Sequence, residues 1–271
     1  MDGSPDVANV ISRLLVGAAL LPLTLGLVWL GGWWLFALAL AMAAVGIHEL
    51  CLVTRPLRPM LIAGYGGVTL TVLGAQLGGA QWALGGFLTT IAFAFVMKGI
   101  SDTKGPATVS IGTTVLGVAW IGLGAALLLL LRDIPAHGRL ACFAVLLAIF
   151  ASDTFAFIGG RLLGRHKLAP TVSPSKTWEG LAFGIAATLF VTWVSVYDRH
   201  WLTQREALLL GAAVAVAAPL GDLFESALKR DMNVKDTGKI LGGHGGVLDR
   251  VDSLLFAIPV AYYVVAAFGK A

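Results

Sequence analysis

Apolar runs long enough to cross a membrane recur along almost the whole of this 271-residue chain. A membrane-spanning helix needs about 20 mostly apolar residues. Nine segments approximate this requirement: 13–30, 33–50, 60–76, 82–97, 110–131, 140–158, 178–197, 205–221 and 253–269. Only 13% of the residues are charged, against about 25% in a typical soluble domain. We therefore expect an all-α polytopic integral membrane protein with about nine transmembrane helices.

The distribution of lysine and arginine favours a cytoplasmic N-terminus. In that orientation, fourteen of the nineteen Lys and Arg residues lie on the cytoplasmic side. Cytoplasmic loops of membrane proteins are enriched in these residues. Two charged loops, 159–177 and 222–252, then face the cytoplasm, so we expect an active site at the cytoplasmic face of the inner or plasma membrane. The net charge of +4 reflects this bias and does not indicate nucleic-acid binding.

The chain divides into two regions that differ in polar content. Residues 1–139 are expected to form transmembrane helices, and residues 140–271 a transmembrane catalytic region that includes both charged loops. Within the second region, Asp153 lies inside an apolar run in "FASDTFAFIGGR". An ionisable residue inside a span is costly and indicates function by default, although an interhelical hydrogen bond would also explain it.

Two pairs of acidic residues lie at the ends of the second charged loop. Asp222 and Glu225 stand three residues apart after the eighth apolar run. Asp249 and Asp252 have the same spacing before the last run. On a helix, each pair would share a face. Solvated charges at the end of a span are the alternative explanation.

Glycines are concentrated between these acids, in "GKILGGHGGVLDR". A glycine-rich turn can direct several backbone N–H groups at a phosphate. The stretch is not a Walker A loop, because it lacks Gly-Lys-Ser/Thr. A flexible loop would explain the glycines equally well, but four cations surround this turn: Lys229, Arg230, Lys235 and Lys239.

A second polar segment, "GRHKLAPTVSPSKTWEG", follows the sixth apolar run. Its two prolines argue against a helix. Its cations and hydroxyl groups suit phosphate oxygens, although a retention loop is the alternative. Acids suited to hard cations therefore share one side of the membrane with many basic residues. This combination fits Mg²⁺-dependent phosphoryl or nucleotidyl transfer, in which the work is positioning and charge neutralisation.

The stretch from Ser226 to Asp252 reads S-x-L-K-R-x₄-K-D-x-G-x₂-L-G-x-H-G-G-V-x-D-R-V-D. It resembles the signature of the phosphatidate cytidylyltransferases, also called CDP-diacylglycerol synthases. The "SDTFAF" and "HKLAPTVSPSKTWEG" segments resemble two further blocks of that family, in the expected order, so the resemblance covers roughly residues 152–252. Family members commonly have proline where this chain has Gly242, and we expect a looser loop there without loss of activity.

The resemblance implies transfer of the cytidylyl group of CTP to phosphatidate, giving CDP-diacylglycerol and pyrophosphate. It implies one or two Mg²⁺ ions, with a further cation allowed, and a homodimer is compatible with it. The leading Mg²⁺ ligands implied are Asp222 and Asp249. Asp153, Glu225 and Asp252 are the second candidates.

The remaining site residues implied by the resemblance form two groups. Catalytic residues, beside the two leading aspartates, are Lys229, Arg230, Lys239 and Arg250. Residues expected to bind substrate are Lys167, Ser173, Ser175, Lys176, Thr177, Ser226, Lys235, Asp236, Gly243, His244, Gly245 and Gly246.

Two other classes of protein stay open at this point. One is another Mg²⁺-dependent lipid-phosphate transferase, such as a CDP-alcohol phosphotransferase, although the D-G-x₂-A-R motif of that family is absent. The other is an ion-coupled transporter with buried acids. A transporter would be favoured by interrupted helices in matching halves, and the sequence contains no inverted repeat.

Overall fold

The protein is built almost wholly of helices in a computed structural model, which describes residues 22–101, 105–197, 201–238 and 245–268. Seven helices in these ranges are long and apolar enough to cross a membrane. The all-α membrane architecture is therefore confirmed, whereas the count of nine spans and the cytoplasmic N-terminus stay predictions. Most of the first expected span, 13–30, lies outside the described residues, and its end at 22–30 is helical.

Within the described ranges, the elements are helices and one small hairpin of strands. Before the hairpin lie α2 (Gly32–Val53), η1 (Arg55–Leu57), α3 (Leu61–Ile100), α4 (Ala107–Gly117), η2 (Val118–Gly122), α5 (Leu123–Arg132) and α6 (Gly138–Leu163). The hairpin and the remaining helices are β1 (Lys167–Ala169), β2 (Ser173–Thr177), α7 (Trp178–Ser195), α8 (Gln204–Asp231) and α9 (Leu248–Ala267).

The 40-residue element α3 is a hairpin of two helical arms. A straight helix of that length would measure about 60 Å, twice the thickness of a bilayer core. The backbone leaves helical geometry at Gly78 and Gly79, and Gly79 has a φ of 71°. The arms pack so closely that a Cβ on Gly67 would meet Thr90. The break falls between the two spans predicted at 60–76 and 82–97.

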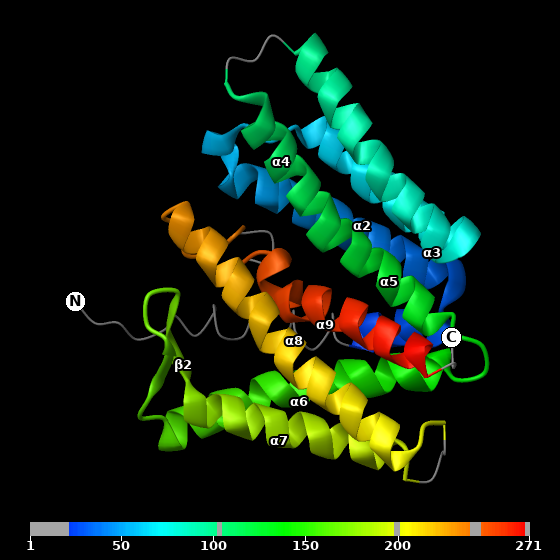
Figure 1. The fold of residues 1–271 in the computed structure, drawn as a ribbon, viewed down its shortest axis with the longest axis vertical. Helices are drawn as coiled ribbons and strands as arrows, with labels where there is room; N and C mark the ends of the chain where they lie inside the picture. Colours follow the sequence, from blue (N-terminus) through cyan, green and yellow to red (C-terminus); the bar gives the residue numbers. More distant parts are fainter. Residues whose placement is uncertain (1–21, 102–104, 198–200, 239–244, 269–271) are drawn as a thin grey trace.

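The helices α8 and α9 pack against each other and lie between two groups of helices (Figure 1). On one side, α9 contacts α5, which in turn contacts α2 and α3. On the other side, α8 contacts α7, which pairs closely with α6. An aromatic cluster joins these groups, because the buried Trp120 ring meets Phe224 of α8 edge-on at 4.9 Å and Phe256 of α9 at 6.4 Å.

Helix α8 extends to Asp231, well beyond the predicted end of its span at 221, and α9 begins at Leu248 rather than at 253. The expected loop 222–252 is therefore helical at both ends. The apolar run ends where predicted, but the helix continues because the charges on its last turns find partners inside the protein. The polar residues of both ends are thus held on rigid helices rather than on a mobile loop.

The proline-containing segment after α6 forms the antiparallel β1–β2 hairpin, in which Lys167 pairs with Thr177 and Ala169 with Ser173. This agrees with the expectation that the segment is not helical. The Thr177 hydroxyl oxygen accepts a hydrogen bond from the Gly180 N–H at 3.1 Å and caps the start of α7. The hairpin is thereby anchored to the helix that follows it.

Candidate active site

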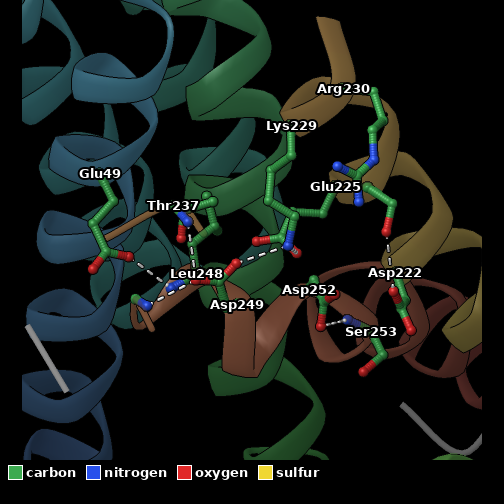
Figure 2. A network of polar contacts seen from close by, with 12 residues as sticks. Glu49, Asp222, Glu225, Lys229, Arg230, Thr237, Leu248, Asp249, Asp252 and Ser253 are labelled. Atoms are coloured by element: carbon green, nitrogen blue, oxygen red, sulfur yellow. Dashed lines mark hydrogen bonds and ion pairs between the residues drawn. The ribbon is translucent and has the colours of Figure 1, made fainter. Parts of the chain in front are cut away.

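A buried group of three charged side chains joins α8 to α9 (Figure 2). The Lys229 Nζ donates to Glu225 Oε2 at 2.7 Å and to Asp249 Oδ1 at 2.8 Å. The exposed fractions of the three side chains are 14% for Lys229, 2% for Glu225 and 8% for Asp249. Glu225 and Lys229 lie one turn apart on the same face of α8, as their spacing predicts. Charges this deeply buried are tolerated only when they are paired.

The second oxygen of Asp249 holds the backbone that leads into α9. Asp249 Oδ2 accepts the N–H groups of Gly246 at 2.8 Å and Thr237 at 3.0 Å. The carboxylate lies in the first turn of α9, where a negative charge also favours the helix dipole. Asp249 therefore ties together both sides of the glycine-rich segment and the lysine of α8.

Glu49 of α2 belongs to the same network, although it is not among the site residues predicted from the sequence. Its Oε1 accepts the Val247 N–H at 3.0 Å and its Oε2 accepts the Leu248 N–H at 2.8 Å. The side chain is fully buried, and a Cβ on Gly238 or Gly246 would collide with its carboxylate. Glu49 thus caps α9 from a helix almost 200 residues away. An acid inside the predicted span 33–50 was the available signal, the same signal that selected Asp153.

A more exposed ion pair connects the β hairpin to α8. The Lys176 Nζ lies 2.6 Å from Asp222 Oδ2, and the Asp222 side chain is 39% exposed. The Ser226 hydroxyl contacts the other oxygen of Asp222 at 3.5 Å. One turn on, Arg230 Nε donates to the carbonyl oxygen of Val172 at 3.3 Å. The two polar segments singled out in the sequence therefore meet at one end of the molecule.

Asp153 and Asp252 face the same region from α6 and α9. The Ser253 hydroxyl donates to Asp153 Oδ2 at 3.1 Å, and the Ser253 N–H donates to Asp252 Oδ1 at 2.8 Å. The buried Asp252 experiences the like charges of Asp222 and Asp153. Three helices thus bring their acidic residues to a single polar cluster.

Other predicted site residues occupy varied positions around this cluster. Lys239, Gly243 and His244 lie outside the described residues. Gly245 has a φ of 81°, in the left-handed region that favours glycine. Ser173 and Thr177 are buried in the hairpin. The side chains that are exposed are those of Lys167, Ser175, Lys235, Asp236 and Arg250.

The carboxylates of the cluster suit a hard cation bound together with phosphate. Among the described residues, no three His, Cys, Asp or Glu side chains are arranged to hold a metal by themselves. Mg²⁺ commonly takes one or two carboxylates and completes its shell with substrate phosphates and water. Asp222 and Asp249 each already bind a cation, a lysine ammonium group. Glu225 Oε1 is buried without a hydrogen-bond partner. These oxygen donors are chemically suited to Mg²⁺.

Comparison with known proteins gives matches along almost the whole chain. The model of the cytidylyltransferase family matches residues 11–268. The chain is 31% identical over 283 residues to a phosphatidate cytidylyltransferase of Mycobacterium bovis, with 95% of this chain and 87% of that protein covered. A phosphatidate cytidylyltransferase of Brucella abortus is 32% identical over 273 residues, with 97% and 96% covered. One of Bacillus subtilis is 38% identical over 159 residues, or 58% of this chain and 59% of that protein. The similarity thus extends into the N-terminal helices, where the sequence contains no recognised motif.

Proposed function

This chain belongs to the cytidylyltransferase family, and from this premise we propose that it transfers the cytidylyl group of CTP to phosphatidate, giving CDP-diacylglycerol and pyrophosphate. Relatives matched over nearly their full length carry the name phosphatidate cytidylyltransferase. The comparisons give no support to an ion-coupled transporter or to another class of lipid-phosphate transferase. The protein is an integral membrane protein by the length and composition of its helices.

The reaction joins two anions without requiring a general base. A phosphate oxygen of phosphatidate attacks the α-phosphorus of CTP and forms a new P–O bond. The bond from the α-phosphorus to the α–β bridging oxygen breaks, and pyrophosphate leaves with the electron pair. A phosphate monoester is largely doubly ionised at pH 7, because its second pKa is about 6. Catalysis therefore depends on bringing negative charges together and on stabilising the charge that develops on the leaving group.

The basic residues of the cluster would neutralise these phosphates. Lys176 and Arg230 lie at its accessible edge, where the hairpin meets α8. Lys229 lies deeper and holds Glu225 and Asp249 in place. We assign the accessible cations to substrate phosphates. The other residues proposed to contact phosphate are Lys167, Lys235, Lys239, His244 and Arg250. The other residues proposed to bind substrate are Ser173, Ser175, Thr177, Ser226, Asp236, Gly243, Gly245 and Gly246.

Asp222 and Asp249 are the proposed Mg²⁺ ligands, and Asp153, Glu225 and Asp252 would serve a second or further cation. Bound Mg²⁺ would supply Lewis-acid stabilisation of the phosphoryl oxygens. The support is the oxygen donor set and the cations that the two leading carboxylates already bind. Loss of turnover in a chelator, with recovery on added Mg²⁺, is the expected result.

The active site is proposed to face the cytoplasm, with nine spans and a cytoplasmic N-terminus. The support is the excess of Lys and Arg on that side in the proposed topology. Labelling of single cysteines placed in 222–252 should occur only from the cytoplasmic side. A homodimer is a further proposal, and the mass of the detergent-solubilised protein tests it.

One observation carries the proposed function: a buried charge network joins α2, α8 and α9 within a chain matched by this family from end to end. The test is purified full-length protein in mixed micelles with labelled CTP. Release of pyrophosphate and formation of CDP-diacylglycerol should both require phosphatidate. Diacylglycerol, which lacks the attacking phosphate, should give neither product. Absence of any phosphatidate-dependent product from folded protein would overturn the proposal.

A further inference from the structure

A pocket with both apolar and basic lining opens where α2 ends and α3 begins, and it includes none of the acidic cluster's residues. Its volume is about 370 Å³, and its lining includes His48, Leu52, Arg55, Arg58, Pro59 and Leu61. From the sequence, its two arginines are expected only to contribute to the positive charge of the cytoplasmic side. Because the catalytic proposal uses none of these side chains, the pocket requires its own explanation.

The charged part of the pocket consists of Arg55 and Arg58. Both are exposed, and within the described ranges neither guanidinium makes a hydrogen bond or ion pair with another side chain. Arg58 adopts left-handed backbone angles, φ 55° and ψ 52°, which are uncommon for a residue other than glycine. Its side chain extends toward Gly105, where an added Cβ would lie 3.4 Å from Arg58 Nη1. A guanidinium group can bind a phosphate through two N–H groups, so both arginines of the lining are suitable phosphate ligands.

The other part of the pocket is apolar and continues onto the surface that faces lipid. Leu52 and Ile62 are 56% and 68% exposed at the ends of two candidate spans. Pro59 and Leu61 line the pocket between them. A phosphate group bound by the arginines would therefore lie next to an apolar surface, as the headgroup and chains of a phospholipid do. A nucleotide or free phosphate would leave that apolar surface unused.

The pocket lies at the same end of the molecule as the acidic cluster. His48, in its lining, directly precedes Glu49, which caps α9. His48 Nδ1 also makes a 2.9 Å hydrogen bond with the Tyr65 hydroxyl, which fixes the end of α2 against α3. A molecule in the pocket thus contacts the helix that positions the start of α9.

We propose that this pocket binds the headgroup phosphate of an anionic phospholipid at the membrane surface. Arg55 and Arg58 bind the phosphate, and Leu52 and Leu61 contact the first carbons of an acyl chain. The inference that an anionic phospholipid binds here depends on the pocket alone. A further consequence is that phosphatidate is held beside the active site before it reacts. That consequence depends also on the proposed function.

The test measures lipid binding and turnover separately on the full-length protein in detergent. The probe is short-chain phosphatidylglycerol, an anionic phospholipid whose phosphate is a diester and which is therefore not the proposed substrate. Its dissociation constant is compared among the wild type, Arg55→Gln, Arg58→Gln and the double variant. Each arginine near a membrane surface contributes roughly a fivefold factor in affinity, so the double variant should bind about 25-fold more weakly. Arg205→Gln, which removes an exposed arginine at the other end of α8, should bind like the wild type.

Two further measurements, competition by inorganic phosphate and the KM for CTP, distinguish the sources of phosphate and the two proposals. Inorganic phosphate at the same concentration should not displace the lipid, and the KM for CTP should stay unchanged in Arg55→Gln. Equal binding of the lipid by the wild type and the double variant would overturn the proposal that this pocket binds lipid, whether or not the protein turns over CTP. Displacement by inorganic phosphate at equal concentration would also overturn the lipid assignment. Loss of lipid binding in the double variant, in a protein that never forms CDP-diacylglycerol, would support the pocket and reject the proposed function.

Discussion

Two lysines of this protein, Lys229 and Lys176, contact carboxylates at similar distances but in very different surroundings. Lys229 lies 2.7 and 2.8 Å from two carboxylates whose side chains are 2% and 8% exposed. Lys176 lies 2.6 Å from Asp222, whose side chain is 39% exposed. The distances alone do not distinguish the two lysines. Burial distinguishes them, because water screens the contact of Lys176 with Asp222 but not the contacts of Lys229. We infer that the buried contacts fix α8 against α9, whereas the exposed contact can exchange its partner for a substrate phosphate.

The largest effect is expected for Lys229→Met. The substitution leaves Glu225 and Asp249 buried without their shared counter-charge. Removal of one partner from a buried ion pair costs about 3–5 kcal/mol. The free energy of unfolding in detergent should fall by that amount, and turnover of CTP should be lost.

A second substitution tests whether the uncompensated charges cause the loss of stability in Lys229→Met. In Lys229→Met combined with Glu225→Gln, one of the two uncompensated charges is gone, while Asp249 keeps its two backbone hydrogen bonds. The double variant should regain part of the lost stability. Wild-type stability of the single variant would contradict the assignment of Lys229 to the fixed part of the site.

A large effect on turnover with a smaller effect on folding is expected for Asp249→Asn. The amide keeps one oxygen acceptor but loses the negative charge that faces Lys229 and the proposed Mg²⁺. Loss of a preorganised charge in an active site commonly costs about 10²–10³ in rate. Formation of CDP-diacylglycerol should fall by that factor while the protein still inserts into the membrane. Asp231→Asn, at the exposed end of α8, is the matched control. Near-normal turnover by Asp249→Asn would remove this residue from the metal site.

A moderate effect is expected for Glu49→Gln, which weakens the cap on α9. A buried carboxylate that accepts two backbone N–H groups makes charge-assisted hydrogen bonds. Loss of such a cap costs about 1–2 kcal/mol. Turnover should also fall, because α9 carries Asp249. Glu206→Gln changes the partly exposed capping box of α8 and should cost less stability. An equal cost for both would show that burial does not matter to these caps.

Much of the fold follows from local sequence properties. The length of the apolar runs is enough to place most helices, and Gly78 and Gly79 mark the break inside α3. The spacing of Glu225 and Lys229 is enough to place them on one face of a helix. The ends of α8 and α9 were predicted wrongly, because hydropathy registers where apolar residues stop and not where buried charges find partners.

The partners within the site could not be predicted in the same way. The sequence indicates which acidic and basic residues belong to the polar segments, but it does not show that Lys176 pairs with Asp222 or that Lys229 pairs with Asp249. These pairings depend on how the β1–β2 hairpin, α8 and α9 pack against one another. Glu49 was missed because its partners lie almost 200 residues away and are backbone N–H groups, which carry no sequence signal.

The smallest effect on stability is expected for Lys176→Met. An exposed ion pair contributes about 0–1 kcal/mol, so the free energy of unfolding should change by no more than that. If Lys176 passes from Asp222 to a phosphate of CTP, the KM for CTP should still rise, on the order of tenfold, which corresponds to about 1.4 kcal/mol. Added salt should raise the wild-type KM for CTP toward that of the variant, because it screens an accessible charge. A loss of stability as large as that of Lys229→Met would remove the distinction between the fixed and the exchangeable lysine.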